Sequence, residues 1–146
     1  KQLLKYTGHK HRDINEYLRE KDPEKAVENE RVLGIDKILS QSKIRKPITV
    51  YRGVEGRMPR ENSTFVSKPY SSASVDPDIA KSYAGRDGYV IYIHLPVGSV
   101  AKDISSISSH PDEGEILIDR NAKFKVKKVN EEDKIVHVQL LSSFNE

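Results

Sequence analysis

The feature that most constrains the fold is a change of hydrophobic period near Pro47. Before it, apolar residues recur at helical spacing, as at Val32, Ile35 and Leu39. After it, apolar and polar residues alternate over short segments, which is the pattern of half-buried strands. Helices first and strands later predict an α+β domain rather than a parallel α/β sheet.

The helical part carries two start signals. Asp13 can cap a short amphipathic run, and Asp22-Pro23 joins a capping carboxylate to a proline at the first helical position. Gly34 is a candidate break that would divide the second helical run in two.

Turn residues separate the strands that the alternation predicts. Pro69 marks a bend between two short extended pieces, and Asp76-Pro77 opens a short helix that Gly85 closes. The extended segments are 48–53, the two pieces within 63–74, then 88–95, 115–118, 122–129 and 134–141.

Composition limits the kind of protein. The 146 residues fit one globular domain, so we expect residues 1–146 to form a single domain, as a mature form or a piece of a longer protein. No apolar run approaches the ~20 residues of a membrane helix. The chain has no cysteine and no H-E-x-x-H spacing, so we expect neither a disulfide nor a metal site.

Charge gives little support to nucleic-acid binding. The net charge is only +3, and basic and acidic residues are interleaved along the chain. The most basic run, "KFKVKK" at 123–128, alternates Phe124 and Val126 with lysines, which favours a strand with one solvated face. We therefore expect no nucleic-acid partner.

Arg52 is the first residue that suggests chemistry. It follows the apolar residues of "ITVYRG", and a charge on a strand built for burial needs a partner. That partner is either a structural carboxylate or the phosphate or carboxylate oxygens of a ligand, which a guanidinium can clamp. Gly53 would let such a ligand approach the backbone closely.

The serine cluster "YSSAS" at 70–74 is the second feature. Such clusters usually serve turns. No G-x-S-x-G elbow is present, which weakens a nucleophilic role. A serine that orients another side chain remains open.

The third feature is the pair Glu113 and Glu115. Residues two apart in an extended segment point to one face, where two carboxylates repel each other at a cost in stability. Solvated surface charge is one interpretation. Glu115, however, opens the apolar run "ILI" at the edge of the core, where carboxylates are more often functional. Gly114 between them suggests a loop that can move.

The order of these features resembles that of the Arg–Ser–Glu class of mono-ADP-ribosyltransferases, of the arginine-specific E-x-E type, along nearly the whole chain. Ala73 replaces the middle Thr of the family's Ser-Thr-Ser pattern, and His11 and His110 stand where relatives often have aromatics. The matching blocks are "YTGHKHRDIN" with Tyr6, Ile14 and Asn15, "YRG" with Arg52, "YSSASVDPDIAKSYA" with Ser72, Ser74 and Tyr83, and "PDEGEILIDRNAKFKV".

The resemblance implies N-terminal helices packed on a two-sheet β-sandwich. It also implies a monomeric toxin-like or phage-like catalytic domain, secreted or delivered into a target cell. Its substrates would be NAD+ and an arginine on a target protein, with no metal.

The resemblance also implies a role for each site residue. Glu115, held by Ser72, would stabilise the oxocarbenium-like transition state. Glu113 would hold the acceptor arginine and accept its proton. The remaining NAD+ contacts would be Arg52 and Arg86 on the diphosphate, Gly53 on the nicotinamide amide, Tyr83 on the ring, and Tyr6.

Two alternatives stay open. The domain could hydrolyse NAD+ without a protein acceptor, or it could be a non-enzymatic binding module on the same fold. Glu113 separates the first alternative from the transferase, and intact Arg52, Ser72 and Glu115 argue against the second. His110 is the residue that we connect with target choice.

Overall fold

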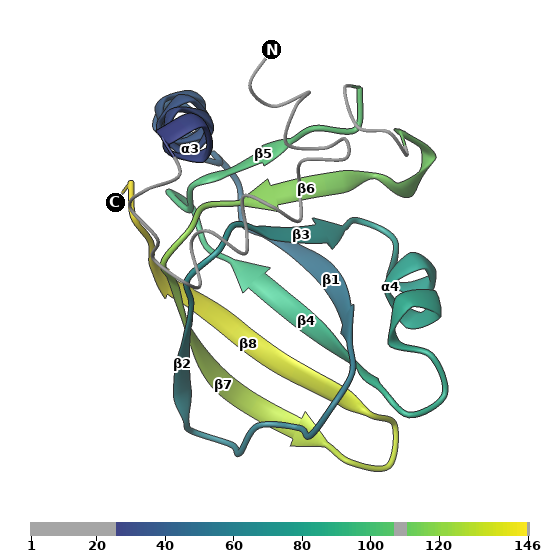
Figure 1. Cartoon of the computed structure of the whole chain (residues 1–146). Helices are drawn as coiled ribbons and strands as arrows, with labels where there is room; N and C mark the ends of the chain where they lie inside the picture. The colour runs from purple at the N-terminus through teal and green to yellow at the C-terminus, as the bar shows by residue number, and fades with distance from the viewer. Residues whose placement is uncertain (1–25, 107–110, 146) are drawn as a thin grey trace.

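The computed structural model describes residues 26–106 and 111–145. These residues form an α+β fold, which confirms the predicted class (Figure 1). The predicted helix starts at Asp13 and Asp22 lie outside the described residues. The elements, in chain order, are α3 (Ala26–Leu39), β1 (Ile48–Val54), β2 (Thr64–Ser67), β3 (Ser71–Ser74), α4 (Pro77–Ala84), β4 (Tyr89–Leu95), β5 (Ala101–Asp103), the 3-10 turn η1 (Pro111–Glu113), β6 (Glu115–Ile118), β7 (Ala122–Asn130) and β8 (Ile135–Ser142).

The described strands form one hydrogen-bonded sheet in the order β2-β7-β8-β4-β1-β3-β6-β5. The expected division into two separate sheets is therefore not confirmed. The link between β1 and β3 is narrow, because their register has the single pair Tyr51–Ser74, whereas β1 pairs with β4 along its whole length. Figure 1 shows β3, β5 and β6 turned away from β1, β4, β7 and β8 at this junction.

Helix α3 packs against the part of the sheet that contains β3 and β6. Its buried residues Val32, Ile35 and Leu39 form one apolar cluster with Tyr70 and Leu117. The helix continues through Gly34, so the predicted break there is wrong. A glycine inside a helix costs only about 1 kcal/mol, and burial of residues on both sides of it offsets that cost.

Helix α4 begins and ends as the sequence predicts. The Asp76 carboxylate accepts a hydrogen bond from the Asp78 amide at 2.9 Å, Pro77 occupies the first turn, and Gly85 ends the helix with a positive φ of 68°. The helix lies directly on β1 at Gly53. A Cβ added there would lie 1.9 Å from the carbonyl oxygen of Ala80, so the backbone of α4 fills the space of the missing side chain. The close approach of α4 is therefore a structural reason for glycine at position 53, and a ligand contact with the Gly53 backbone stays a prediction.

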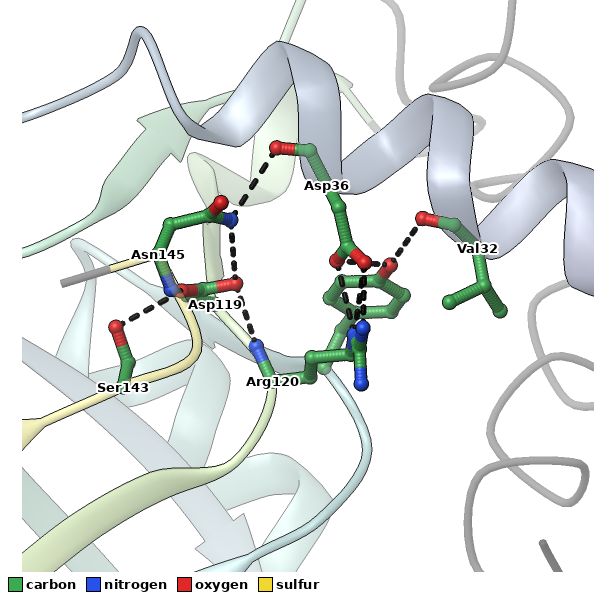
Figure 2. Close-up of polar contacts among 7 residues, drawn as sticks. Val32, Asp36, Asp119, Arg120, Ser143 and Asn145 are labelled. Carbon is green, nitrogen blue, oxygen red and sulfur yellow. Dashed lines mark hydrogen bonds and ion pairs between the residues drawn. The ribbon is translucent and has the colours of Figure 1, made fainter.

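A partly buried ion pair joins Asp36 on α3 to Arg120, two residues after the end of β6 (Figure 2). Arg120 Nε lies 2.9 Å from both carboxylate oxygens of Asp36, and Arg120 Nη2 lies 2.7 Å from Oδ2. The Tyr70 hydroxyl lies 2.7 Å from Asp36 Oδ1 and 2.8 Å from the Val32 carbonyl oxygen. Because Tyr70 precedes β3 and Arg120 follows β6, the network fixes the ends of two strands that carry predicted site residues.

The neighbouring carboxylate, Asp119, ties the chain end to the same network. It is fully buried and accepts hydrogen bonds from the Ser143 hydroxyl at 2.8 Å and the Asn145 amide at 2.7 Å. Burial is the main cause that raises the pKa of Asp119, although these donors act in the opposite direction. Phe144 completes the arrangement, with its ring centroid 3.6 Å from the Arg120 guanidinium carbon.

The basic run at 123–128 behaves as the alternation predicts. Phe124 and Val126 are buried in the core of the sheet, and Lys123 and Lys127 are exposed. Within residues 26–106 and 111–145, no helix is long and apolar enough to cross a membrane.

Candidate active site

The strands that carry Arg52, Ser72 and Glu115 are neighbours in the sheet, in the order β1-β3-β6. Arg52 Nη1 donates a hydrogen bond to the Ser72 carbonyl oxygen at 3.4 Å across the narrow β1–β3 junction. In the β3–β6 ladder, Ser74 is opposite Glu115 and Ser72 is opposite Leu117. Ser72 and Glu115 therefore share one face and stand on a diagonal, which a glutamate side chain can span.

The Ser72 hydroxyl is a buried polar group without a hydrogen-bond partner among the described residues. The expected bond between Ser72 and Glu115 is therefore not formed in this structure. A buried hydroxyl without a partner costs roughly 1–3 kcal/mol, so a function for it is a reasonable expectation.

Glu113 does not lie in an extended segment, so the premise that it shares a strand face with Glu115 is wrong. It ends the 3-10 turn η1, and Gly114 has a positive φ of 57° that redirects the chain before β6 begins. The two carboxylates thus leave different local structures, although only one residue separates them.

Hydrogen bonds from β3 hold the described end of this loop. The Ser74 hydroxyl donates to the Glu113 carbonyl oxygen at 2.5 Å, and the Val75 amide donates to the Gly114 carbonyl oxygen at 3.1 Å. On the other side, the Ile104 amide donates to the Glu115 carbonyl oxygen at 3.0 Å. Hydrogen bonds thus join the backbone around both glutamates to neighbouring segments, and movement of the loop at Gly114 stays a prediction.

Tyr83, on α4, lies against the Glu113 side chain. Its hydroxyl is 2.9 Å from Oε1 and 3.0 Å from Oε2. This hydrogen bond is the largest of the causes that raise the pKa of Tyr83, followed by burial and the charges of Glu113, Glu115 and Asp112. The predicted packing of the ring on nicotinamide stays a prediction.

Arg52 also lines a cavity of about 600 Å³ beneath the β1–β2 loop. Its walls include Ile91 and Phe124, and Arg57 and Arg60 line it with Arg52. The sequence interpretation missed these two arginines, although all three fall close together in "RGVEGRMPR". Their charges suit an anionic ligand, and their spacing is the signal that could have found them.

Other predicted residues lie elsewhere. Ser72, Tyr83, Arg86, Glu113 and Glu115 are not part of this cavity wall. The carbonyl oxygen of Arg86 accepts a hydrogen bond from Lys134 Nζ at 3.1 Å, in the turn between α4 and β4. Tyr6, His11 and His110 lie outside the described residues. Among the residues that the structure describes, no group of three or more His, Cys, Asp or Glu side chains could hold a metal ion.

Comparison with known proteins shows which proteins this chain is similar to. A curated relative, the NAD(+)–arginine ADP-ribosyltransferase EFV of Enterococcus faecalis, is 29% identical over 119 residues, which cover 75% of this chain and 23% of the relative. The chain thus spans about a quarter of the length of that relative.

Two solved structures share the fold. Plx2a, an ADP-ribosyltransferase toxin from Paenibacillus larvae, superposes with a TM-score of 0.83 at 24% identity, over 97% of this chain and 84% of the toxin chain. Exoenzyme S from Pseudomonas aeruginosa was solved with human 14-3-3 protein beta and Carba-NAD. It gives a TM-score of 0.80 at 21% identity, over 94% of this chain and 70% of the Exoenzyme S chain.

The model of the ADP-ribosyltransferase exoenzyme family matches residues 1–143, almost the entire sequence. This chain therefore belongs to the ADP-ribosyltransferase exoenzyme family.

Proposed function

We propose that this domain transfers ADP-ribose from NAD+ to an arginine side chain of a target protein. The observation that carries the proposal is the adjacency of β1, β3 and β6, which gathers Arg52, Ser72 and Glu115. Glu113, one residue before β6, adds the second carboxylate. The match to the family over residues 1–143 supports the same activity.

The reaction breaks the bond between the ribose C1′ and the nicotinamide nitrogen. Nicotinamide leaves as a neutral molecule with the bonding electron pair, so no acid is needed to expel it. Positive charge develops on the ribose, as in glycoside hydrolysis. We assign its electrostatic stabilisation to the Glu115 carboxylate. The Ser72 hydroxyl would orient Glu115 once substrate is bound, which would satisfy its missing hydrogen bond.

Attack by arginine requires help, because a guanidinium has a pKa above ~12 and is a poor nucleophile. A carboxylate that binds the guanidinium and accepts its proton as the new bond to C1′ forms meets this need. We assign that role to Glu113. Arg52, on the cavity wall, would bind the diphosphate, and the binding of Carba-NAD by Exoenzyme S supports an NAD+ site on this fold.

The finer expectations belong to the same proposal. Strands β1, β2, β4, β7 and β8 would form one layer of the expected sandwich, and β3, β5 and β6 would form the other. The substrate would bind where the two layers meet, between β1 and β3. The domain would work as a monomer, part of a secreted protein or one delivered into a target cell, as the toxin relatives suggest. The predicted contacts of Tyr6, Gly53 and Arg86 with NAD+ remain part of the proposal.

The test is to incubate the protein with labelled NAD+ and agmatine, a small arginine analogue, and then with a cell lysate. We expect ADP-ribosyl-agmatine and at least one labelled protein band. In Glu113→Gln, the ratio of transfer to NAD+ hydrolysis should fall at least about tenfold, because one catalytic proton acceptor is lost. Hydrolysis without any transfer by the unmodified protein would show a glycohydrolase instead. Tight target binding without turnover would show a binding module.

A further inference from the structure

Tyr83 is placed unusually for a large aromatic residue. It is 59% exposed on α4, yet its hydroxyl makes a specific contact with one carboxylate. The distances to the two Glu113 oxygens differ by only 0.1 Å, so the hydroxyl lies opposite the middle of the carboxylate edge. An exposed hydrogen bond with this symmetry fixes the direction in which the carboxylate points.

The helix that presents Tyr83 is anchored at two points. Asp76 caps its first turn, and the close contact at Gly53 sets its distance from β1. The Glu113 backbone is fixed independently, because the Ser74 hydroxyl donates to its carbonyl oxygen. Glu113 is therefore held at its main chain by β3 and at its side chain by α4.

We propose that Tyr83 is a positioning residue for the acceptor arginine: its hydroxyl orients the Glu113 carboxylate for the incoming guanidinium. This inference rests on the proposed function, and it concerns the hydroxyl group rather than the ring. A carboxylate offers about four acceptor positions, so the phenol occupies one edge and leaves the outer lone pairs for guanidinium N–H groups. Part of the conformational freedom that Glu113 would lose on binding arginine is then lost before the acceptor arrives.

The charges near Tyr83 support this role. The Glu113 hydrogen bond, burial and the charges of Glu113, Glu115 and Asp112 all raise the pKa of the phenol. The hydroxyl therefore keeps its proton, and remains a donor, throughout the neutral and mildly alkaline range.

The test compares Tyr83→Phe, which keeps the ring and removes the hydroxyl, with the unmodified protein. The rates of ADP-ribosyl-agmatine formation and of NAD+ hydrolysis are measured at saturating NAD+. We expect the ratio of transfer to hydrolysis to fall about three- to tenfold, with a raised KM for agmatine, which is the range for loss of one typical intramolecular hydrogen bond. Ser82→Ala is the matched control, because it removes a hydroxyl on the same helix that donates a hydrogen bond to the Ile79 carbonyl oxygen. It should leave the ratio unchanged.

A second background tests whether Tyr83 acts through Glu113. Glu113→Asp keeps a carboxylate but withdraws it by one methylene from the phenol. In that background, Tyr83→Phe should change the ratio by less than about twofold, because the contact is already lost. An equal fall in both backgrounds would overturn the proposal, as would an unchanged ratio for Tyr83→Phe alone.

The contact also has a readout that needs no NAD+. Tyrosine is labelled at the ring carbon that bears the oxygen, and NMR follows the ionisation of Tyr83. The signal of Tyr83 is identified because it is absent from the spectrum of Tyr83→Phe. Glu113→Gln should lower the pKa of Tyr83 toward the ordinary value, and an unchanged titration would contradict the contact. If the protein consumes no NAD+, the proposed function fails, and the titration still decides whether Tyr83 holds Glu113.

Discussion

Replacement of Gly53 by alanine gives the most direct test of how the site is supported. The added Cβ would lie 1.9 Å from the Ala80 carbonyl oxygen and 2.5 Å from the Ala84 amide nitrogen. Both atoms belong to the backbone of α4, so no side chain can rotate away. Ordinary contact begins near 3.4 Å, so the helix would have to withdraw by roughly 1.5 Å.

Such a withdrawal opens the cluster in which Ala80 and Ala84 pack with Val90, Tyr51 and Tyr92. Overpacking in a well-packed core costs about 1–3 kcal/mol, and the opened cluster adds to this. We therefore expect Gly53→Ala to lower the free energy of unfolding by at least about 3 kcal/mol. Urea unfolding followed by circular dichroism measures this free energy.

Gly98→Ala is the control. Apart from its chain neighbours, no described residue lies within 4 Å of a Cβ added at Gly98, so the unfavourable feature is its positive φ of 91°, at about 1–2 kcal/mol. If Gly53→Ala costs no more than Gly98→Ala, the packing argument is wrong. A stable Gly53→Ala protein that no longer binds NAD+ would instead assign the glycine to the ligand.

Three further predictions concern the network, the site and pH. Arg120→Ala leaves the buried Asp36 carboxylate without its bidentate partner and should cost about 3 kcal/mol of unfolding free energy; a cost near zero in urea unfolding would show that the ion pair contributes little. Ser72→Ala removes a buried hydroxyl that has no partner among the described residues, so stability should stay the same or rise while NAD+ turnover falls; loss of stability would imply a structural hydrogen bond. Burial, followed by the charges of His94 and Lys128, lowers the pKa of His137 in the folded protein. The neutral His137 side chain therefore contributes to stability above the ordinary histidine pKa of ~6.5, and this contribution is lost as pH falls through the folded-state pKa. Thermal unfolding between pH 8 and pH 5 should show a smaller acid decrease in His137→Gln, and an identical profile would contradict this assignment.

Local patterns predicted most elements of the fold. The capped helix α4 and strands β1, β4, β6, β7 and β8 were all anticipated, because capping residues and alternation are short-range signals. The sequence did not reveal β5 or η1, since both are only three residues long and carry no period. It also could not reveal that one sheet joins all the described strands, because strand order depends on pairing between distant segments.

Long-range contacts also explain the limits at the site. The Tyr83–Glu113 bond joins residues that lie 30 positions apart, and the Arg120–Asp36 pair spans 84 positions. Neither pair has a local pattern. The prediction of an extended conformation at Glu113 was wrong because Gly114 adopts a left-handed backbone conformation. Glycine permits this conformation but does not require it, so the sequence E-G-E did not reveal it.

The measurement that tests the central claim most directly is NAD+ turnover by Glu115→Gln. Nicotinamide release and ADP-ribosyl-agmatine formation are quantified together, with circular dichroism to show that the variant is folded. If Glu115 stabilises the ribosyl cation, both rates should fall together by about 10²–10³-fold, as expected for loss of a main electrostatic contact to the transition state. Rates equal to those of the unmodified protein would contradict the proposed mechanism.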